Sequence, residues 1–218
     1  MAILTKENEI VNQNLVANVL SLTQFTISLF IALRIFYLYS QARRPRLFIL
    51  GLSMGIFSLT AIASFIGDNI ASFPLNLNWF KYTSQTVCFL FILLSLFRSE
   101  DGYLRRLMYW YIIASLLLLF LLTPIVPASF PDPALTKSLL GGSRSLICLV
   151  VSLYYIGAFS LKQTRFSLLM GVAFQLLSLG YWMNMFKYFL PHMTQVDQVG
   201  DVTRITGLIS LLIAILLG

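Results

Sequence analysis

The sequence predicts an all-α integral membrane protein, a bundle of about seven transmembrane helices with its N-terminus outside and its C-terminus facing the cytoplasm. Composition is the first reason. Of 218 residues, 58% are hydrophobic and only 11% are charged, too few charges to cover a soluble domain of this size. Run length is the second reason, because apolar runs recur at about the 20 residues that a helix needs to cross a bilayer. Backbone groups in lipid must pair internally, so these runs are helices.

The first element is a polar segment over residues 1–14, which we expect to be extracytoplasmic. We do not expect a cleavable signal here, because the apolar run that follows is too long and lacks a cleavage site of small residues. A Pro-rich outer loop, residues 127–137, separates four helices in residues 15–126 from three in residues 138–218. The expected spans are Leu15–Tyr39, Leu47–Ile66, Trp79–Phe97, Leu107–Val126, Gly141–Ser160, Phe166–Leu190 and Val202–Gly218.

Basic residues gather on one side of this predicted bundle. Nine Lys and Arg residues and two acidic residues lie in or near the short connections 40–46, 98–106 and 161–165, whereas the other side has six of each. Because cytoplasmic loops carry the excess of Lys and Arg, we expect these basic loops on the cytoplasmic side of a plasma-type membrane. The net charge of +7 then reflects topology and anionic lipid headgroups rather than nucleic acid.

A short internal similarity accompanies the loop at 127–137. The sequence RLFILG at 46–51 opens the second span, and RFSLLMG at 165–171 opens the sixth. This pattern is consistent with three helices, one linking helix and three more helices. The two copies differ by one residue in spacing, and apolar segments also resemble one another by chance, so a repeat is one of two interpretations.

Charged residues near the outer ends of the spans predict a candidate ligand pocket. An ionisable group inside a membrane is costly, so each one is a functional hypothesis. Arg144 is the first candidate, because the sequence GGSR at 141–144 carries it into a closely packing helix. Such a pocket suits an anionic or amphipathic ligand. The alternative is an interfacial belt of aromatic and snorkelling basic side chains. The candidate residues are Arg144, Lys81, Lys187, Asp68, Trp182 and Tyr181.

Other motifs predict structure rather than chemistry. Gly51 and Gly55 form a G-x-x-x-G pattern that allows close helix packing, within the bundle or with a partner. Cys88 and Cys148 lie in apolar runs and are expected to be buried hydrophobic side chains, with no metal site. His192, the one histidine, is expected in an exposed loop. With one histidine, no pair of intramembrane carboxylates and no hydrolase or nucleotide motif, the chain is not expected to be an enzyme.

The function expected first is that of an accessory or scaffold subunit, which binds partner helices, lipids or pigments in a larger membrane complex. Aromatic-rich helices with 18 Phe and few deep polar groups favour it. The first alternative is a seven-helix sensory or receptor-like domain with an outward-facing pocket. The second is a small solute transporter. Its three-plus-one-plus-three order is similar to that of sugar transporters with PQ-loops, but the chain has no Pro-Gln dipeptide and no proline near the middle of a span.

Cofactors and partners follow from the same observations. The last span, Val202–Gly218, contains no lysine, so a covalently bound retinal of the microbial rhodopsin kind is not expected. No other cofactor is indicated. The expected partners are the lipid bilayer and protein subunits of a membrane complex, and no nucleic acid.

Overall fold

The computed structural model describes residues 2–69, 77–98, 100–123, 132–186 and 194–217, with the side chains of 2–14, 17, 67–69, 78, 194, 195 and 197 left out. This part of the chain is all-helical. Each of its helices contains a segment long and apolar enough to cross a membrane, which confirms the predicted seven-span helical architecture at that level. The helices are α1 (Ala2–Ala42), α2 (Pro45–Asn69), α3 (Leu77–Phe97), α4 (Asp101–Phe120), α5 (Pro133–Lys162), α6 (Arg165–Phe186) and α7 (Thr194–Leu217).

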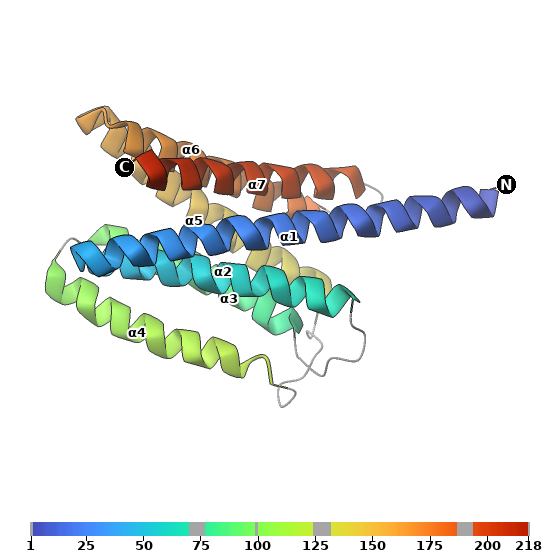
Figure 1. The fold of residues 1–218 in the computed structure, drawn as a ribbon, viewed down its shortest axis with the longest axis horizontal. Helices are drawn as coiled ribbons and strands as arrows, with labels where there is room; N and C mark the ends of the chain where they lie inside the picture. Colours follow the sequence, from blue (N-terminus) through green and yellow to red (C-terminus); the bar gives the residue numbers. More distant parts are fainter. Residues whose placement is uncertain (1, 70–76, 99, 124–131, 187–193, 218) are drawn as a thin grey trace.

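The helices run up and down, so that consecutive turns lie at alternate ends of the bundle (Figure 1). The turns α1–α2, α3–α4 and α5–α6 lie together at one end, which we call the basic end because they hold the predicted clusters of Arg and Lys. The opposite end, where α3, α5 and α7 begin, is called the pocket end after the cavity described below. The N-terminal part of α1 extends beyond the pocket end, and the C-terminal end of α7 lies at the basic end (Figure 1).

Four helices begin at least six residues earlier than the sequence predicted; one of them, α7, begins at Thr194 rather than Val202. α1 begins at Ala2, within the polar segment expected to precede the first span. α4 begins at Asp101 rather than Leu107, with its acidic residue in the first turn, where the helix dipole favours negative charge. α5 begins at Pro133 rather than Gly141, so part of the expected loop 127–137 is helical. Asp132 caps this helix by accepting a hydrogen bond from Leu135 N at 3.1 Å.

The remaining differences concern helix ends. α4 ends at Phe120, before the expected Val126, and α6 is described to Phe186. Residues 124–131, 187–193 and 218, which include predicted span ends and His192, lie outside the described residues. The bounds of α2 and α3 lie within three residues of the predicted ones at all ends, because apolar runs and turn residues agree there.

Two turns at the basic end have the same backbone conformation. Arg43 after α1 and Gln163 after α5 both have φ of 48°, in the left-handed region that glycine usually occupies at helix ends. Arg43 donates its backbone N–H to Tyr39 O, and Gln163 donates to Phe159 O, both at 2.7 Å. Both helices therefore end with the same cap, which turns the chain directly into the next helix.

The helices α5–α7 repeat the spacing of α1–α3. The end of α5 lies 120 residues after the end of α1, the start of α6 lies 120 residues after the start of α2, and the ends of α7 and α3 have the same offset. α4 lies between these two three-helix units and returns the chain to the pocket end. Both units therefore run in the same direction, in the three-plus-one-plus-three order that the sequence favoured as one interpretation.

Equivalent positions make equivalent contacts in the two units. Ser58 Oγ donates to Phe25 O at 3.4 Å between α2 and α1, and Ser178 Oγ donates to Ser145 O at 2.8 Å between α6 and α5. Both residues of the second pair follow the first by the same offset as the helix ends. Between the units, α3 packs against α5 and α7 packs against α1. An approximate two-fold relation between the units would exchange these two contacts.

The most extensive helix contact joins α6 and α7, and glycines permit it. A Cβ atom on Gly180 would lie 2.7 Å from Gly200 O, and one on Gly207 would lie 3.0 Å from Ala173 O. Backbones approach this closely only where side chains are absent. The sequence analysis missed these three glycines, because they lie on two different helices and form no G-x-x-x-G pattern.

The two glycines that were predicted to mediate packing differ in their surroundings. A Cβ atom on Gly51 would lie 3.2 Å from Ile35 Cγ2 of α1, whereas a Cβ atom on Gly55 would have no described atom within 4 Å. Gly51 therefore lies at the α1–α2 contact, and its counterpart Gly171 lies at the α5–α6 contact, with Ile156 Cγ1 at 3.0 Å. A side chain at Gly55 would therefore meet open space within the described chain.

α4 lies at the edge of the bundle (Figure 1), where it packs on α2 and α3. Tyr111 holds it there. Its ring stacks on Phe91 of α3 with centroids 4.2 Å apart, and its hydroxyl lies 2.8 Å from Ser53 Oγ of α2. Among the described residues, α4 and α5 do not pack against each other. A gap therefore separates the linking helix from the second three-helix unit.

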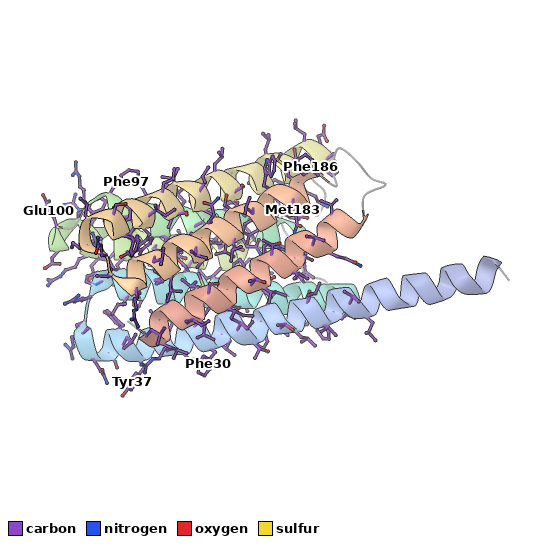
Figure 2. The ribbon with its side chains drawn as sticks, turned by 90° about the horizontal axis from the view of Figure 1, so that it is seen from above. Phe30, Tyr37, Phe97, Glu100, Met183 and Phe186 are labelled. Carbon is purple, nitrogen blue, oxygen red and sulfur yellow. The ribbon has the colours of Figure 1, made fainter. Side chains whose placement is uncertain are left out.

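Large apolar side chains cover the outside of the bundle. Phe30 and Tyr37 project outward from α1 (Figure 2) and are 53% and 55% exposed. Trp110 and Leu116 of α4 are exposed to a similar degree. An apolar surface on all sides is costly in water and favourable in lipid, which supports membrane insertion. The direction of insertion stays a prediction.

Cysteine labelling tests that direction. Ala134 and Lys162 are exposed at opposite ends of α5, and the native Cys88 and Cys148 are 1% and 0% exposed, so these thiols are shielded from reagents. We expect a membrane-impermeant maleimide on intact cells to label the Ala134→Cys variant and not the Lys162→Cys variant. Permeabilised cells should show both labels. The reverse pattern on intact cells would invert the topology, and the unaltered chain is the control.

Candidate functional site

A cavity of about 100 Å³ opens toward the pocket end among α3, α5, α6 and α7. We call it the Arg144 pocket. It lies where α3 of the first three-helix unit meets α5 of the second, which is one of the two contacts between the units. Its lining residues are Lys81, Tyr82, Gln85, Gly141, Arg144, Tyr181, Asn184, Met185, Asp201 and Arg204.

Arg144 is buried at the inner side of this pocket, with 5% of its surface exposed. Its Nη1 donates a hydrogen bond to Gln85 Oε1 across the α3–α5 contact, and its Nε donates to Leu140 O at 3.0 Å. The sequence placed Arg144 within a turn or two of a helix end. Because α5 begins at Pro133, Arg144 instead lies about three turns inside the helix.

Aromatic rings surround the guanidinium. Arg144 Cζ lies 4.8 Å from the ring centroid of Tyr181 and 5.3 Å from that of Tyr82. Arg204 Cζ lies over Tyr181 as well, at 5.1 Å. Cation–π contacts stabilise a cation more strongly where water is excluded. Tyr181 therefore helps to hold two positive groups at one buried site, one from α5 and one from α7.

Gln85 connects the pocket to the first unit. Its Nε2 donates to Thr60 Oγ1 of α2 at 3.2 Å, while its Oε1 accepts from Arg144 and lies 3.4 Å from Tyr181 Oη. Both Gln85 and Thr60 are buried. The hydrogen bonds join α2, α3, α5 and α6, and a satisfied buried network of this kind fixes the relative positions of its members.

Asp201 is the carboxylate among the described lining residues. It forms an ion pair with Arg204 one turn later on α7 and accepts a hydrogen bond from Asn184 Nδ2 at 2.8 Å. The described lining thus carries three cations, Lys81, Arg144 and Arg204, and one anion. The electrostatic potential of such a pocket favours a negatively charged occupant.

The structure brings together three of the six predicted pocket residues: Arg144, Lys81 and Tyr181 line one cavity. Trp182 does not line it, since its side chain is 50% exposed and packs edge-to-face on Phe186, with ring centroids 5.0 Å apart. The side chains of Asp68 and Lys187 lie outside the described residues.

Two pocket residues, Asp201 and Arg204, are absent from the six predicted ones. The sequence pattern placed them in the last outer loop, but α7 begins at Thr194, so both lie within the helix. Their spacing of three residues was a usable signal, because residues i and i+3 share a helix face. The polar residues before Val202 concealed the helix start.

No protein-family model, curated protein sequence or solved structure matches this chain. The functional argument therefore depends on the geometry of the pocket and on the arrangement of the two three-helix units.

Proposed function

We propose that this chain is a multi-pass membrane protein that binds a small anionic solute in the Arg144 pocket and carries it across the membrane. The observation that carries the proposal is the buried guanidinium of Arg144 at the contact between the two units, joined to Gln85. Charged groups within spans are rare and mark solute and ion pathways.

The size of the pocket limits the solute. A volume of about 100 Å³ corresponds to roughly three water molecules. A guanidinium is planar and offers parallel N–H donors. These donors match the oxygens of a carboxylate or phosphate group better than the compact ammonium group of a lysine does. A small carboxylate or a small inorganic anion fits both the volume and the charge of the lining.

The internal repeat favours transport over sensing as the use of this pocket. In transporters built from repeated units, solutes bind at the contact between the units, and movement of one unit against the other changes access. Arg144 and Gln85 belong to different units, so their hydrogen bond crosses such a contact. Core side chains on the same helices, including Phe89 and Phe174, lie between the pocket and the basic end.

Uptake into proteoliposomes tests the proposal. We expect saturable uptake of at least one anion from a set of chloride, nitrate, acetate, lactate and phosphate. Glycerol, which is neutral, and potassium, which is a cation, should enter the proteoliposomes no faster than they enter liposomes without protein. Absence of uptake for every anion, together with absence of binding by calorimetry, would refute the proposal. Binding without uptake would support the receptor-like alternative instead.

An accessory-subunit function stays a second proposal, and one observation favours it. α1 has 41 residues, and its N-terminal part projects beyond the pocket end in both views (Figures 1 and 2). The part of a helix that projects from a bundle offers a surface on which a partner protein can pack. Purification in a gentle detergent followed by mass spectrometry tests this, since a subunit should bring defined partner proteins in stoichiometric amounts. A chain that purifies alone argues against it.

A further inference from the structure

Another cavity lies at the basic end, between α4 and the second three-helix unit. It measures about 700 Å³ and is lined by residues of α2, α3, α4, α5 and α6. We call it the basic crevice. α4 and α5 both line it although they do not pack against each other within the described residues. The crevice therefore occupies the space between these two helices at the basic end.

The inner walls of the crevice are apolar. Leu50, Ile92, Leu104 and Met170 contribute side chains from four different helices. Tyr155 closes one side, where its ring stacks on Phe174 with centroids 6.2 Å apart. An apolar slot between helices accepts a hydrocarbon chain at low cost, because the contacts with the helices replace similar contacts with other lipid chains.

The rim of the crevice is strongly basic. Arg43, Arg44, Arg46, Arg105 and Lys162 line it, against Asp101 as the acidic residue. These side chains come from three separate segments of the chain, so the cluster is a product of the fold rather than of one basic run.

Arg46 lies deepest among them and already has a fixed orientation. Its Nη2 donates to Arg98 O at 3.1 Å, while its Nε is buried and has no acceptor among the described residues. A buried donor of this kind is costly unless an acceptor oxygen reaches it.

We propose that the basic crevice binds one anionic phospholipid, with an acyl chain between α4 and α5 and the phosphate at Arg46 and Arg105. Basic pockets between spans at the cytoplasmic surface recognise anionic headgroups, and each Lys or Arg there contributes to the attraction. The apolar walls select a lipid over a soluble phosphate compound, because a free phosphate would leave them uncovered. This site is separate from the Arg144 pocket and does not depend on transport.

A charge-matched pair of variants tests the proposal. The double variant Arg46→Gln, Arg105→Gln removes two rim charges, and Arg106→Gln, Arg165→Gln removes two exposed charges from the same end outside the crevice. Native mass spectrometry of the purified chain titrated with phosphatidylglycerol measures the affinity. We expect the first variant to bind roughly 10- to 30-fold more weakly and the second to bind as the unaltered chain does. If both double variants lose the same affinity for phosphatidylglycerol, the loss comes from the general surface charge of this end, and the proposal is overturned.

Two further measurements separate a lipid from other ligands. Ala158→Phe should fill the apolar part of the crevice and weaken binding of phosphatidylglycerol while all rim charges remain. Glycerol phosphate, which carries the same phosphate without acyl chains, should compete poorly. Equally strong binding of glycerol phosphate, or of phosphatidylcholine, would refute an anionic lipid site. Arg144→Ala should leave lipid binding unchanged, so this proposal and the proposed transport function can fail independently.

Discussion

Replacing Arg144 with alanine is expected to weaken binding of the proposed anionic solute by about 30- to 5,000-fold, because truncating a buried, hydrogen-bonded charged group costs about 2–5 kcal/mol. The loss has two sources. The guanidinium no longer meets the solute, and Gln85 Oε1 loses its donor at a site where both side chains are buried. Uptake into proteoliposomes and calorimetric binding measure the effect.

Two controls accompany this variant. Arg144→Lys keeps the charge but loses the planar donor pair, so it should retain an intermediate affinity. Arg165→Ala removes an exposed arginine at the basic end and should leave affinity unchanged. If Arg144→Ala unfolds in detergent, the lysine variant still decides the question. If folded variants at position 144 bind the anion as tightly as the unaltered chain, the Arg144 pocket is not the binding site.

Replacing Gly200 with alanine should destabilise the α6–α7 contact. The new Cβ would overlap Asn184 Oδ1 and lie 3.0 Å from Gly180 O, so the Asn184 side chain must move and the two backbones must shift slightly apart. Overpacking a close contact typically costs about 1–3 kcal/mol. The pocket should be affected as well, because Asn184 donates to Asp201 there. The midpoint of thermal unfolding in detergent is the measurement.

Gly55→Ala is the matched control for this variant. Both substitutions add one methyl group to a glycine within a helix, but a Cβ on Gly55 would meet no described atom within 4 Å. Alanine favours helix over glycine by up to about 1 kcal/mol, so Gly55→Ala should be neutral or stabilising. If the two variants unfold at the same temperature, the close approach of α6 and α7 does not depend on glycine at position 200.

Much of the architecture follows from the sequence, because membrane spans depend on run length and little else. The helices α2 and α3 have nearly their predicted bounds. The errors occur where polar residues belong to helices. Arg105 and Arg106 made the start of α4 look like a loop, and the Pro-rich stretch before Gly141 concealed the Asp132 cap of α5. Charge and proline mark the membrane boundary, whereas helices continue past it.

The site was predictable in part, and the limits are physical. Arg144 and Lys81 were candidates because ionisable groups in spans are rare. Their common cavity was not predictable, because sequence patterns do not determine which helices are neighbours in lipid. Asp201 and Arg204 reach the pocket only because Gly180 and Gly200 allow α7 to approach α6 closely. That approach involves glycines on separate helices, which a motif within one helix cannot reveal.

The contact between α1 and α7 has a consequence for how the protein is made. Ile31 and Ile35 of α1 are fully buried in the core cluster, and Leu208 and Leu211 of α7 belong to the same cluster. At synthesis rates of about 5–20 residues per second, α7 leaves the ribosome roughly 10–35 s after α1. During that interval one face of α1 faces lipid or the insertion machinery instead of its final neighbour. The contact between α1 and α7 therefore forms last. Substitutions at this contact should lower the yield of correctly assembled protein before they change the properties of the assembled bundle.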